Sequence, residues 1–263
     1  KPFARLMERL IPGRDELLPV WPEYLHETDL ARPEVALAGV ARELRREMAL
    51  GRRMFDLLLE LRQEYREGIR NNMVYLEMMV NNLRAEIVAY LRRISVHELN
   101  TDRSKRLFAY TAQADDLERL CNHLLPLADL IRIKHRRRID FSERAMKELG
   151  EIEAMVGANL QDAEILIVNG AGGEKERLRK ISDREERIDQ AVKRAREAHL
   201  VRFHQRVCQA EAGPIFSRCS SIWSVFPTTA RTSQTMRPIW PGRIDGEPGQ
   251  RPGRPLHEKV LTQ

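Results

Sequence analysis

The prolines of this 263-residue chain divide it into three parts. Five lie at or before Pro33, seven lie at or after Pro214, and Pro126 stands alone between these two groups. Because proline removes a backbone donor and clashes with the preceding turn of a helix, a long proline-poor stretch favours helix. No segment shows the sustained period-two alternation of a half-buried strand. The sequence therefore predicts an all-α protein that is largely helical from 34 to 213.

Apolar residues recur every three or four positions in five stretches of this interior, which is the spacing of one helix face. The first stretch follows Pro33, and proline suits the first turn of a helix. We therefore predict long helices joined by short polar turns near 67–71 and 98–102 and by a glycine-rich stop at 169–173. The stretches are 37–61, 73–91, 107–127, 145–168 and 174–205.

The sequence contains an internal repeat. An i, i+4 pair, Glu77 with Asn81, precedes one helical stretch, and a second such pair, Glu185 with Asp189, precedes a later one. Each repeat then forms a three-helix bundle. The expected organisation is a leading linker, a first bundle, a truncated second bundle and a disordered tail. Their ranges are 1–32, 33–138, 139–216 and 217–263.

The tail does not continue the second repeat. The third helical stretch carries DDLERLCNH at 115–123, and its counterpart is expected near 222–231, where no amphipathic period is found. Six prolines and four glycines in 217–263 favour disorder. Permitted codons for 218–229, read in a shifted frame, give MFFNLERIPDH and restore the missing helix. An out-of-frame segment and an ordinary disordered basic tail both remain open.

Charge and cysteine content exclude several classes of protein. The net charge is +6, but 217–263 hold seven Lys/Arg against three Asp/Glu, while the other residues hold 38 against 36. The basic run KHRRR at 134–138 closes a helix, where cations also favour the helix dipole, so we expect no nucleic-acid partner. The three cysteines lie far apart without a CxxC motif, which indicates a reducing compartment. No apolar run reaches the ~20 residues of a membrane helix, so the chain itself is expected to be soluble.

Motifs for catalysis are sparse. The sequence holds one Glu-x-x-His, at Glu23 and His26, whereas a di-iron bundle needs two on facing helices. The segment NGAGG at 169–173 is not followed by GK[ST], so it is not a phosphate loop. We therefore expect a binding or regulatory protein that is not an enzyme and requires no cofactor.

Five segments together resemble the PhoU-like domain at the C-terminal, cytoplasmic end of bacterial sodium/phosphate cotransporter family proteins. They cover about 20–216 and read PEYLHETDLARPEVALAGVARELRREM from Pro22, VNNLRAEIVAYL from Val80, DDLERLCNH from Asp115, EERIDQAVKRAREAHLVRF from Glu185 and CQAEAGPIF from Cys208. The resemblance implies two PhoU-like three-helix bundles side by side, the second incomplete. It also implies regulation of phosphate uptake or export at the cytoplasmic face of the bacterial inner membrane.

The partners that this resemblance implies are a membrane-embedded carrier preceding Lys1 and a second PhoU-like domain in a dimer. A free-standing PhoU-type phosphate-signalling regulator is the alternative.

The resemblance also implies a metal site, since PhoU domains hold metal clusters on acidic i, i+4 motifs. Carboxylates one helical turn apart point the same way and can share a hard or intermediate cation. Asparagine offers a neutral oxygen in place of an anion, so we expect the first repeat to bind a divalent or iron-type ion weakly. Acids that only line a solvated face are the alternative. The corresponding pairs are Glu77 with Asn81, Glu118 with Asn122, and Glu185 with Asp189.

Overall fold

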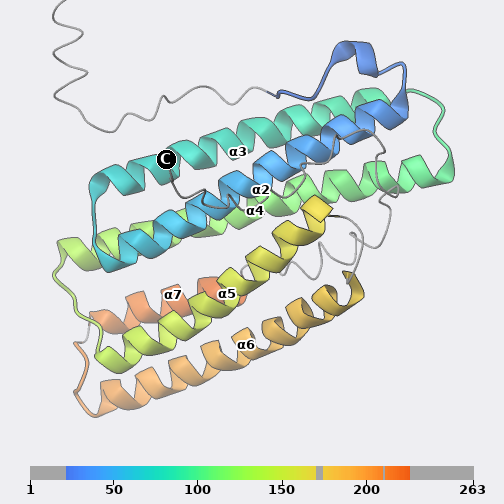
Figure 1. The fold of residues 1–263 in the computed structure, drawn as a ribbon. Helices are drawn as coiled ribbons and strands as arrows, with labels where there is room; N and C mark the ends of the chain where they lie inside the picture. Colours follow the sequence, from blue (N-terminus) through green and yellow to red (C-terminus); the bar gives the residue numbers. More distant parts are fainter. Residues whose placement is uncertain (1–21, 170–173, 210, 226–263) are drawn as a thin grey trace, which may run out of the picture.

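The computed structural model describes residues 22–169, 174–209 and 211–225, and every regular element in these ranges is a helix (Figure 1). This confirms the all-α prediction for the described part of the chain. A short 3-10 helix precedes six long α-helices. The elements are η1 (Glu27–Asp29), α2 (Pro33–Gln63), α3 (Glu67–Ile94), α4 (Thr101–Arg136), α5 (Glu143–Asn169), α6 (Glu174–His204) and α7 (Ala212–Val225).

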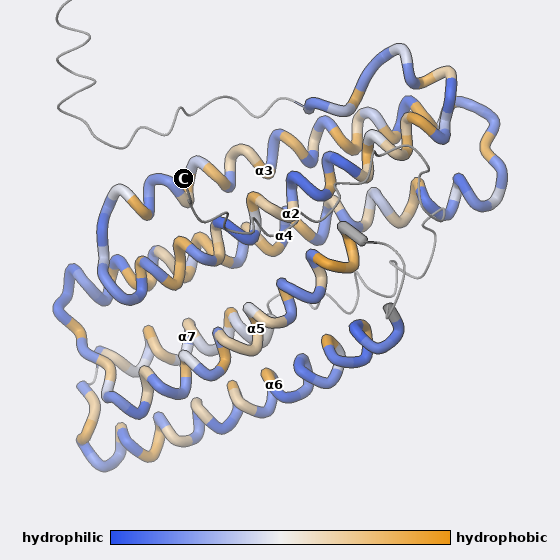
Figure 2. Tube along the Cα trace, in the orientation of Figure 1, coloured by the Kyte–Doolittle hydropathy of each residue, from blue (hydrophilic) through white to orange (hydrophobic). Residues whose placement is uncertain are grey.

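The helices form two three-helix bundles, as the sequence predicts. The first bundle consists of α2, α3 and α4, and the second bundle consists of α5, α6 and α7. Figure 2 shows that short blocks of apolar and polar residues alternate along the helices. This alternation follows the turn of the helix, so each helix has one apolar face that can be buried. The apolar faces meet in one core that runs through both bundles, with residues such as Leu44, Leu83, Leu124 and Ile152 almost completely buried.

The bundles lie side by side through two helix contacts, α2 with α5 and α4 with α7. Along the first contact, Arg45 donates to the carbonyl oxygen of Ile167 and Arg52 donates to that of Gly157, each over 3.3 Å. The residue numbers rise along α2 while they fall along α5, so these two helices run antiparallel. Gly157 permits their close approach, because an added Cβ would lie 3.2 Å from the Phe55 ring.

One predicted turn is misplaced. The connection between α2 and α3 occupies 64–66, and residues 67–71, which were expected to form it, are the first turns of α3. Glu67 places a carboxylate in the first turn of α3, where negative charge is favourable. The polar residues of this stretch therefore begin a helix and do not form a turn. Pro126 lies inside α4 without ending it.

The end of the second bundle also departs from the prediction. We expected no packed helix from residue 217 onward, and this is wrong for 217–225, because α7 continues to Val225. Phe216, Cys219 and Trp223 are buried at intervals of three and four residues, which is enough to form one apolar face among the serines. The second bundle therefore has a third helix, although α7 has 14 residues and α4 has 36. Residues 1–21 of the predicted linker 1–32 and residues 226–263 of the predicted tail 217–263 lie outside the described residues.

Candidate functional site

A leading arm, residues 22–30, is fixed against the first bundle. The carboxylate of Glu43 on α2 is buried and accepts hydrogen bonds from the backbone N–H groups of Glu23 and Tyr24, the second over 2.6 Å. Gly39 lies one turn earlier, where an added Cβ would come within 2.3 Å of the Tyr24 carbonyl oxygen. The arm thus lies directly on the α2 backbone, and the Glu23 carboxylate forms an ion pair of 2.8 Å with Arg46 on the same helix.

The arm is also attached to α3. The Tyr90 hydroxyl donates to the carbonyl oxygen of His26 over 2.7 Å, and Arg93 forms an ion pair with Glu27. Contacts with two helices fix both the position and the direction of the arm. Sequence reasoning singled out Pro22–Leu25 as a family feature but did not identify Glu43, Gly39 or Tyr90 as the residues that hold it.

A second unusual group is Glu47, one turn after Glu43 on α2. Its side chain is completely buried, and neither carboxylate oxygen has a hydrogen-bond partner among the described residues. Burial raises the pKa of Glu47 well above its ordinary value, because the charged form is poorly solvated there. Sequence reasoning missed this residue, although its spacing from Leu44 and Gly51 places it on the apolar stripe of α2.

One member of the predicted first-repeat pairs acts on this buried carboxyl group, since the negative charge of Glu118 raises the pKa of Glu47 further. The Cys121 thiol of α4 has its pKa raised mainly by burial, and the charges of Glu47, Glu77 and Glu118 raise it further. Acidic groups from α2, α3 and α4 therefore all act electrostatically on one thiol. Asn122 donates to Glu118 over 2.7 Å, so the two members of this i, i+4 pair do face each other.

The other members of the predicted metal pairs are arranged less favourably. Asn81 is half-buried, and its side-chain oxygen has no hydrogen-bond partner in the described part of the chain. Glu185 is half-buried and Asp189 is exposed, and both lie on α6 in the second bundle. No group of three or more His, Cys, Asp or Glu residues in the described ranges is arranged to hold a metal ion.

Arg84 occupies a position beside this acidic cluster. It donates to one oxygen of Asp115 over 2.6 and 2.8 Å, and its positive charge also favours the ionised form of Glu47. A guanidinium in this position supplies positive charge near the carboxylates. Metal binding by these residues remains a prediction.

We expect metal content to follow the carboxylate pairs. Restoring acids by Asn81→Asp and Asn122→Asp adds two anionic ligands beside Glu77 and Glu118, so the variant should bind more Mn²⁺ or Fe²⁺ than the unaltered chain. Glu185→Ala with Asp189→Ala should lower the bound metal. Elemental analysis after dialysis checks both, and unchanged metal content in both variants would leave these residues as ordinary surface acids.

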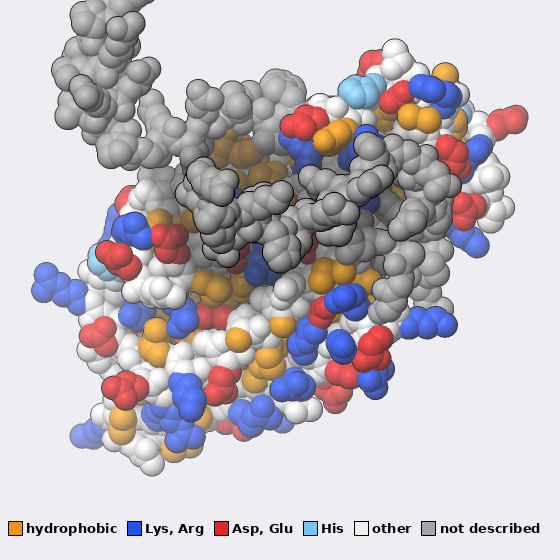
Figure 3. All heavy atoms as spheres, in the orientation of Figure 1, with side chains coloured by type: hydrophobic (Ala, Val, Ile, Leu, Met, Phe, Trp, Pro, Cys, Tyr) orange, Lys and Arg blue, Asp and Glu red, His pale blue; other side chains and the backbone are white. Residues whose placement is uncertain are grey.

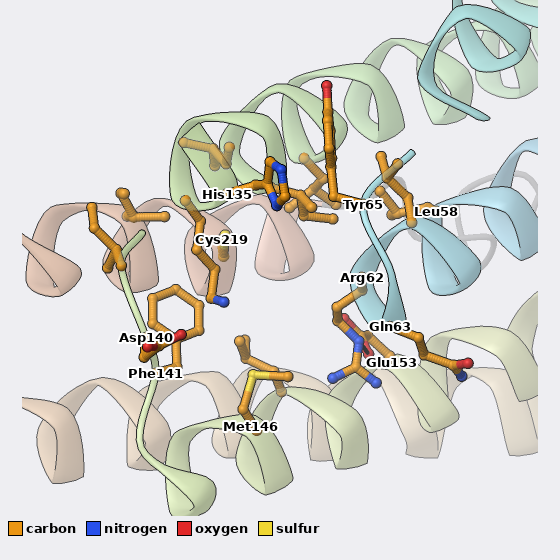
Figure 4. A pocket seen from close by; sticks show the side chains of 18 of the residues that line it. Leu58, Arg62, Gln63, Tyr65, His135, Asp140, Phe141, Met146, Glu153 and Cys219 are labelled. Carbon is orange, nitrogen blue, oxygen red and sulfur yellow. Dashed lines mark ion pairs between the residues drawn. The ribbon is translucent and has the colours of Figure 1, made fainter. Parts of the chain in front are cut away.

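A pocket of about 520 Å³ lies between the two bundles (Figure 4). It is lined by the C-terminal ends of α2 and α4, the first turns of α5, the connector 137–142 and one face of α7. Tyr65 stacks on His135 at its edge, with ring centroids 4.6 Å apart. Arg62 and Glu153 form an ion pair of 2.8 Å on one side, and burial raises the pKa of Glu153 to about 7 although Arg62 opposes this rise.

These features define the chain as an all-α protein of two packed three-helix bundles, with an arm attached to the first bundle and a pocket between the two. In fold it is similar to the phosphate transport system regulatory protein PhoU from Streptococcus pneumoniae, with a TM-score of 0.69, 12% sequence identity and coverage of 78% of this chain and 95% of that chain. The PhoU-like fold is thereby confirmed.

No family model and no curated protein sequence matches the chain. Among the described helices, none is both long and apolar enough to cross a membrane.

Proposed function

We propose that this chain is a regulatory module of phosphate transport, acting as the cytoplasmic PhoU-like domain of a sodium-dependent phosphate transporter. Its partner is the membrane carrier part that precedes the leading arm, and its role is to modulate phosphate uptake or export at the inner membrane. The likeness to PhoU of Streptococcus pneumoniae supports the regulatory role. The segment beginning PEYLHETDL at Pro22 supports the cotransporter context.

The attachment of the arm carries this proposal. A domain joined to its carrier by a flexible linker moves independently, whereas an arm bonded to two helices moves with them. Glu43, Gly39 and Tyr90 fix residues 22–30 to α2 and α3. A displacement of the first bundle would therefore move the arm with it.

A free-standing PhoU-type regulator is the second candidate. It is favoured by coverage of 95% of the Streptococcus pneumoniae chain, because that regulatory protein is matched almost from end to end. The coding sequence upstream of Lys1 separates the two candidates. Several membrane helices would support the cotransporter domain, and a start codon within a few residues would support the free regulator.

We expect Gly39→Ala to alter phosphate transport, because the added Cβ must displace the Tyr24 backbone, which lies 2.3 Å away. The full-length gene is expressed in a bacterial host lacking its own phosphate uptake systems, and uptake of radioactive phosphate is measured at low and high external phosphate. The ratio of the two rates should change at least about twofold, since a displaced arm no longer transmits movement of the bundle.

Gly68→Ala is the matched control, because an added Cβ at this helical glycine meets nothing within 4 Å. Its uptake ratio should equal that of the unaltered protein. Equal ratios for Gly39→Ala and Gly68→Ala would contradict coupling through the arm.

A further inference from the structure

We propose that the pocket between the two bundles binds an anionic amphiphile, meaning a small molecule with an apolar body and a carboxylate or phosphate-monoester head group. This inference goes beyond regulation of a phosphate carrier and does not depend on it. The volume of about 520 Å³ lies within the range of about 300 to 1,000 Å³ that is usual for small-molecule sites. Both bundles line the pocket, so a ligand there would contact both at once.

The apolar body would be held by the wall of the pocket. Side chains from α2, α4, α5 and α7 form this wall, including Leu58, Leu127, Leu149 and Trp223. Each of these residues is almost completely buried, so the wall is an opening in the continuous core and not a patch on the outer surface. An apolar ligand is therefore removed from water on several sides when it enters.

The polar groups are divided between two sides of the pocket. Figure 4 shows Arg62 and Glu153 together on one side, and Asp140 with Phe141 on the other. The Arg62 guanidinium is already paired with the Glu153 carboxylate over 2.8 Å. Because their charges offset each other, this side offers little attraction to an anionic head group.

The head group would lie beside Lys134 and Arg138. Both side chains line the pocket, and neither forms an ion pair with a carboxylate of the described residues. The Lys134 ammonium lies 5.4 Å from the centroid of the Phe141 ring. Figure 4 shows Phe141 on the side opposite the Arg62–Glu153 pair. The lining of the pocket as a whole holds three cations, Arg62, Lys134 and Arg138, against the two acidic groups Asp140 and Glu153, so its charge balance is positive.

The contrast with other arginines of the bundles supports this assignment. Arg70, Arg84 and Arg202 each form a close ion pair that joins two helices. These three cations thus have carboxylate partners on a neighbouring helix, whereas Lys134 and Arg138 have none among the described residues. A carboxylate or phosphate-monoester ligand would supply a negative charge that can pair with Lys134 and Arg138.

Isothermal titration of the full chain with dodecanoate tests the proposal, at concentrations below micelle formation. Dodecanoate should bind, and dodecanol, which has the same tail without the charge, should bind at least about tenfold more weakly. Dodecyl phosphate should bind as dodecanoate does if the site accepts both head groups, and the tighter of the two identifies the preferred one. Inorganic phosphate alone should give no binding heat.

Variants then locate the ligand. Lys134→Met and Arg138→Asn should each weaken dodecanoate binding about tenfold; asparagine is chosen because Arg138 has a positive φ of 53°. Arg137→Gln removes the same charge from an exposed neighbour outside the pocket and should leave binding unchanged. Met146→Trp, which fills the pocket from α5, should abolish binding while the helix content measured by circular dichroism is preserved.

Three results would overturn the proposal. They are equal affinities for dodecanol and dodecanoate, equal weakening by Arg137→Gln and the two pocket variants, and binding of inorganic phosphate without binding of dodecanoate. Phosphate uptake is not used as a readout, so failure of this proposal would leave the regulatory role untouched.

Discussion

Replacing Trp223 by alanine is expected to lower the free energy of unfolding of the second bundle by about 3–5 kcal/mol. Trp223 is 2% exposed and meets the Phe55 ring edge-on, with centroids 6.1 Å apart. It therefore fills space between α7 and α2, and its loss leaves a cavity that neighbouring side chains fill only in part. Urea denaturation followed by far-ultraviolet circular dichroism measures the change.

Ile222→Ala is the control for this experiment, because Ile222 is the half-buried neighbour of Trp223 on the same helix. It should cost about 1 kcal/mol, since less apolar surface leaves the core. Hydrogen exchange should show faster exchange in α5, α6 and α7 of the Trp223→Ala protein and unchanged protection in the first bundle. A loss below about 1 kcal/mol with Trp223→Ala would mean that the chain past residue 216 does not pack, as the sequence alone suggested.

Replacing Glu47 by methionine is expected to raise the free energy of unfolding by about 1–3 kcal/mol at pH 8. Glu47 is 0% exposed and its carboxylate has no hydrogen-bond partner among the described residues, so the positive charge of Arg84 offsets its desolvation only in part. Methionine has a similar length and is apolar. Denaturation in urea compares the variant with the unaltered chain.

The gain from Glu47→Met should depend on pH. Burial places the pKa of Glu47 in the folded chain above its unfolded value, so folding takes up a proton between the two. The stability that this group contributes is fully present below the unfolded pKa and is lost as the pH rises through the folded pKa. The variant lacks this loss, so its advantage should be larger at pH 8 than at pH 4.

Glu43→Met gives the matched comparison. Glu43 is equally buried and lies one turn away, but its carboxylate accepts hydrogen bonds from Tyr24 and Arg46. Its replacement leaves the donors of the leading arm unpaired and should therefore be destabilising. Loss of stability in both variants would contradict our interpretation of Glu47 and would indicate that its oxygens have a partner in solution, such as a bound cation.

Glu47 also bears on the metal prediction. A buried carboxyl group without a partner costs stability, and such costs are expected where a site serves function. The charges of Glu47, Glu77 and Glu118 all act on the Cys121 thiol, and Glu118 also raises the pKa of Glu47, so the acids restored by Asn81→Asp and Asn122→Asp would add negative charge to the same part of the first bundle. The stability experiment and the metal-binding experiment therefore test the same group of acidic residues by two independent measurements.

The regular part of the fold could be predicted because its signal is local. Apolar residues three and four positions apart, with proline confined to the ends, predict helices close to those observed for α2 through α6. The prediction failed for α7, where the apolar face is made of a few residues such as Phe216 and Trp223 among serines. So short a stripe is recognised only when the surface that it covers is known.

The sequence by itself determined that this protein is helical, that its helices group into two bundles, and that pairs such as Glu118 and Asn122 share one helix face. Only the tertiary structure decided that the Glu43 carboxylate has hydrogen-bond partners, that the Glu47 carboxylate has none among the described residues, and that Lys134 lines a pocket against α5 and α7. The physical reason is that helix period is set by neighbours within one turn, whereas desolvation and charge pairing are set by side chains from other helices.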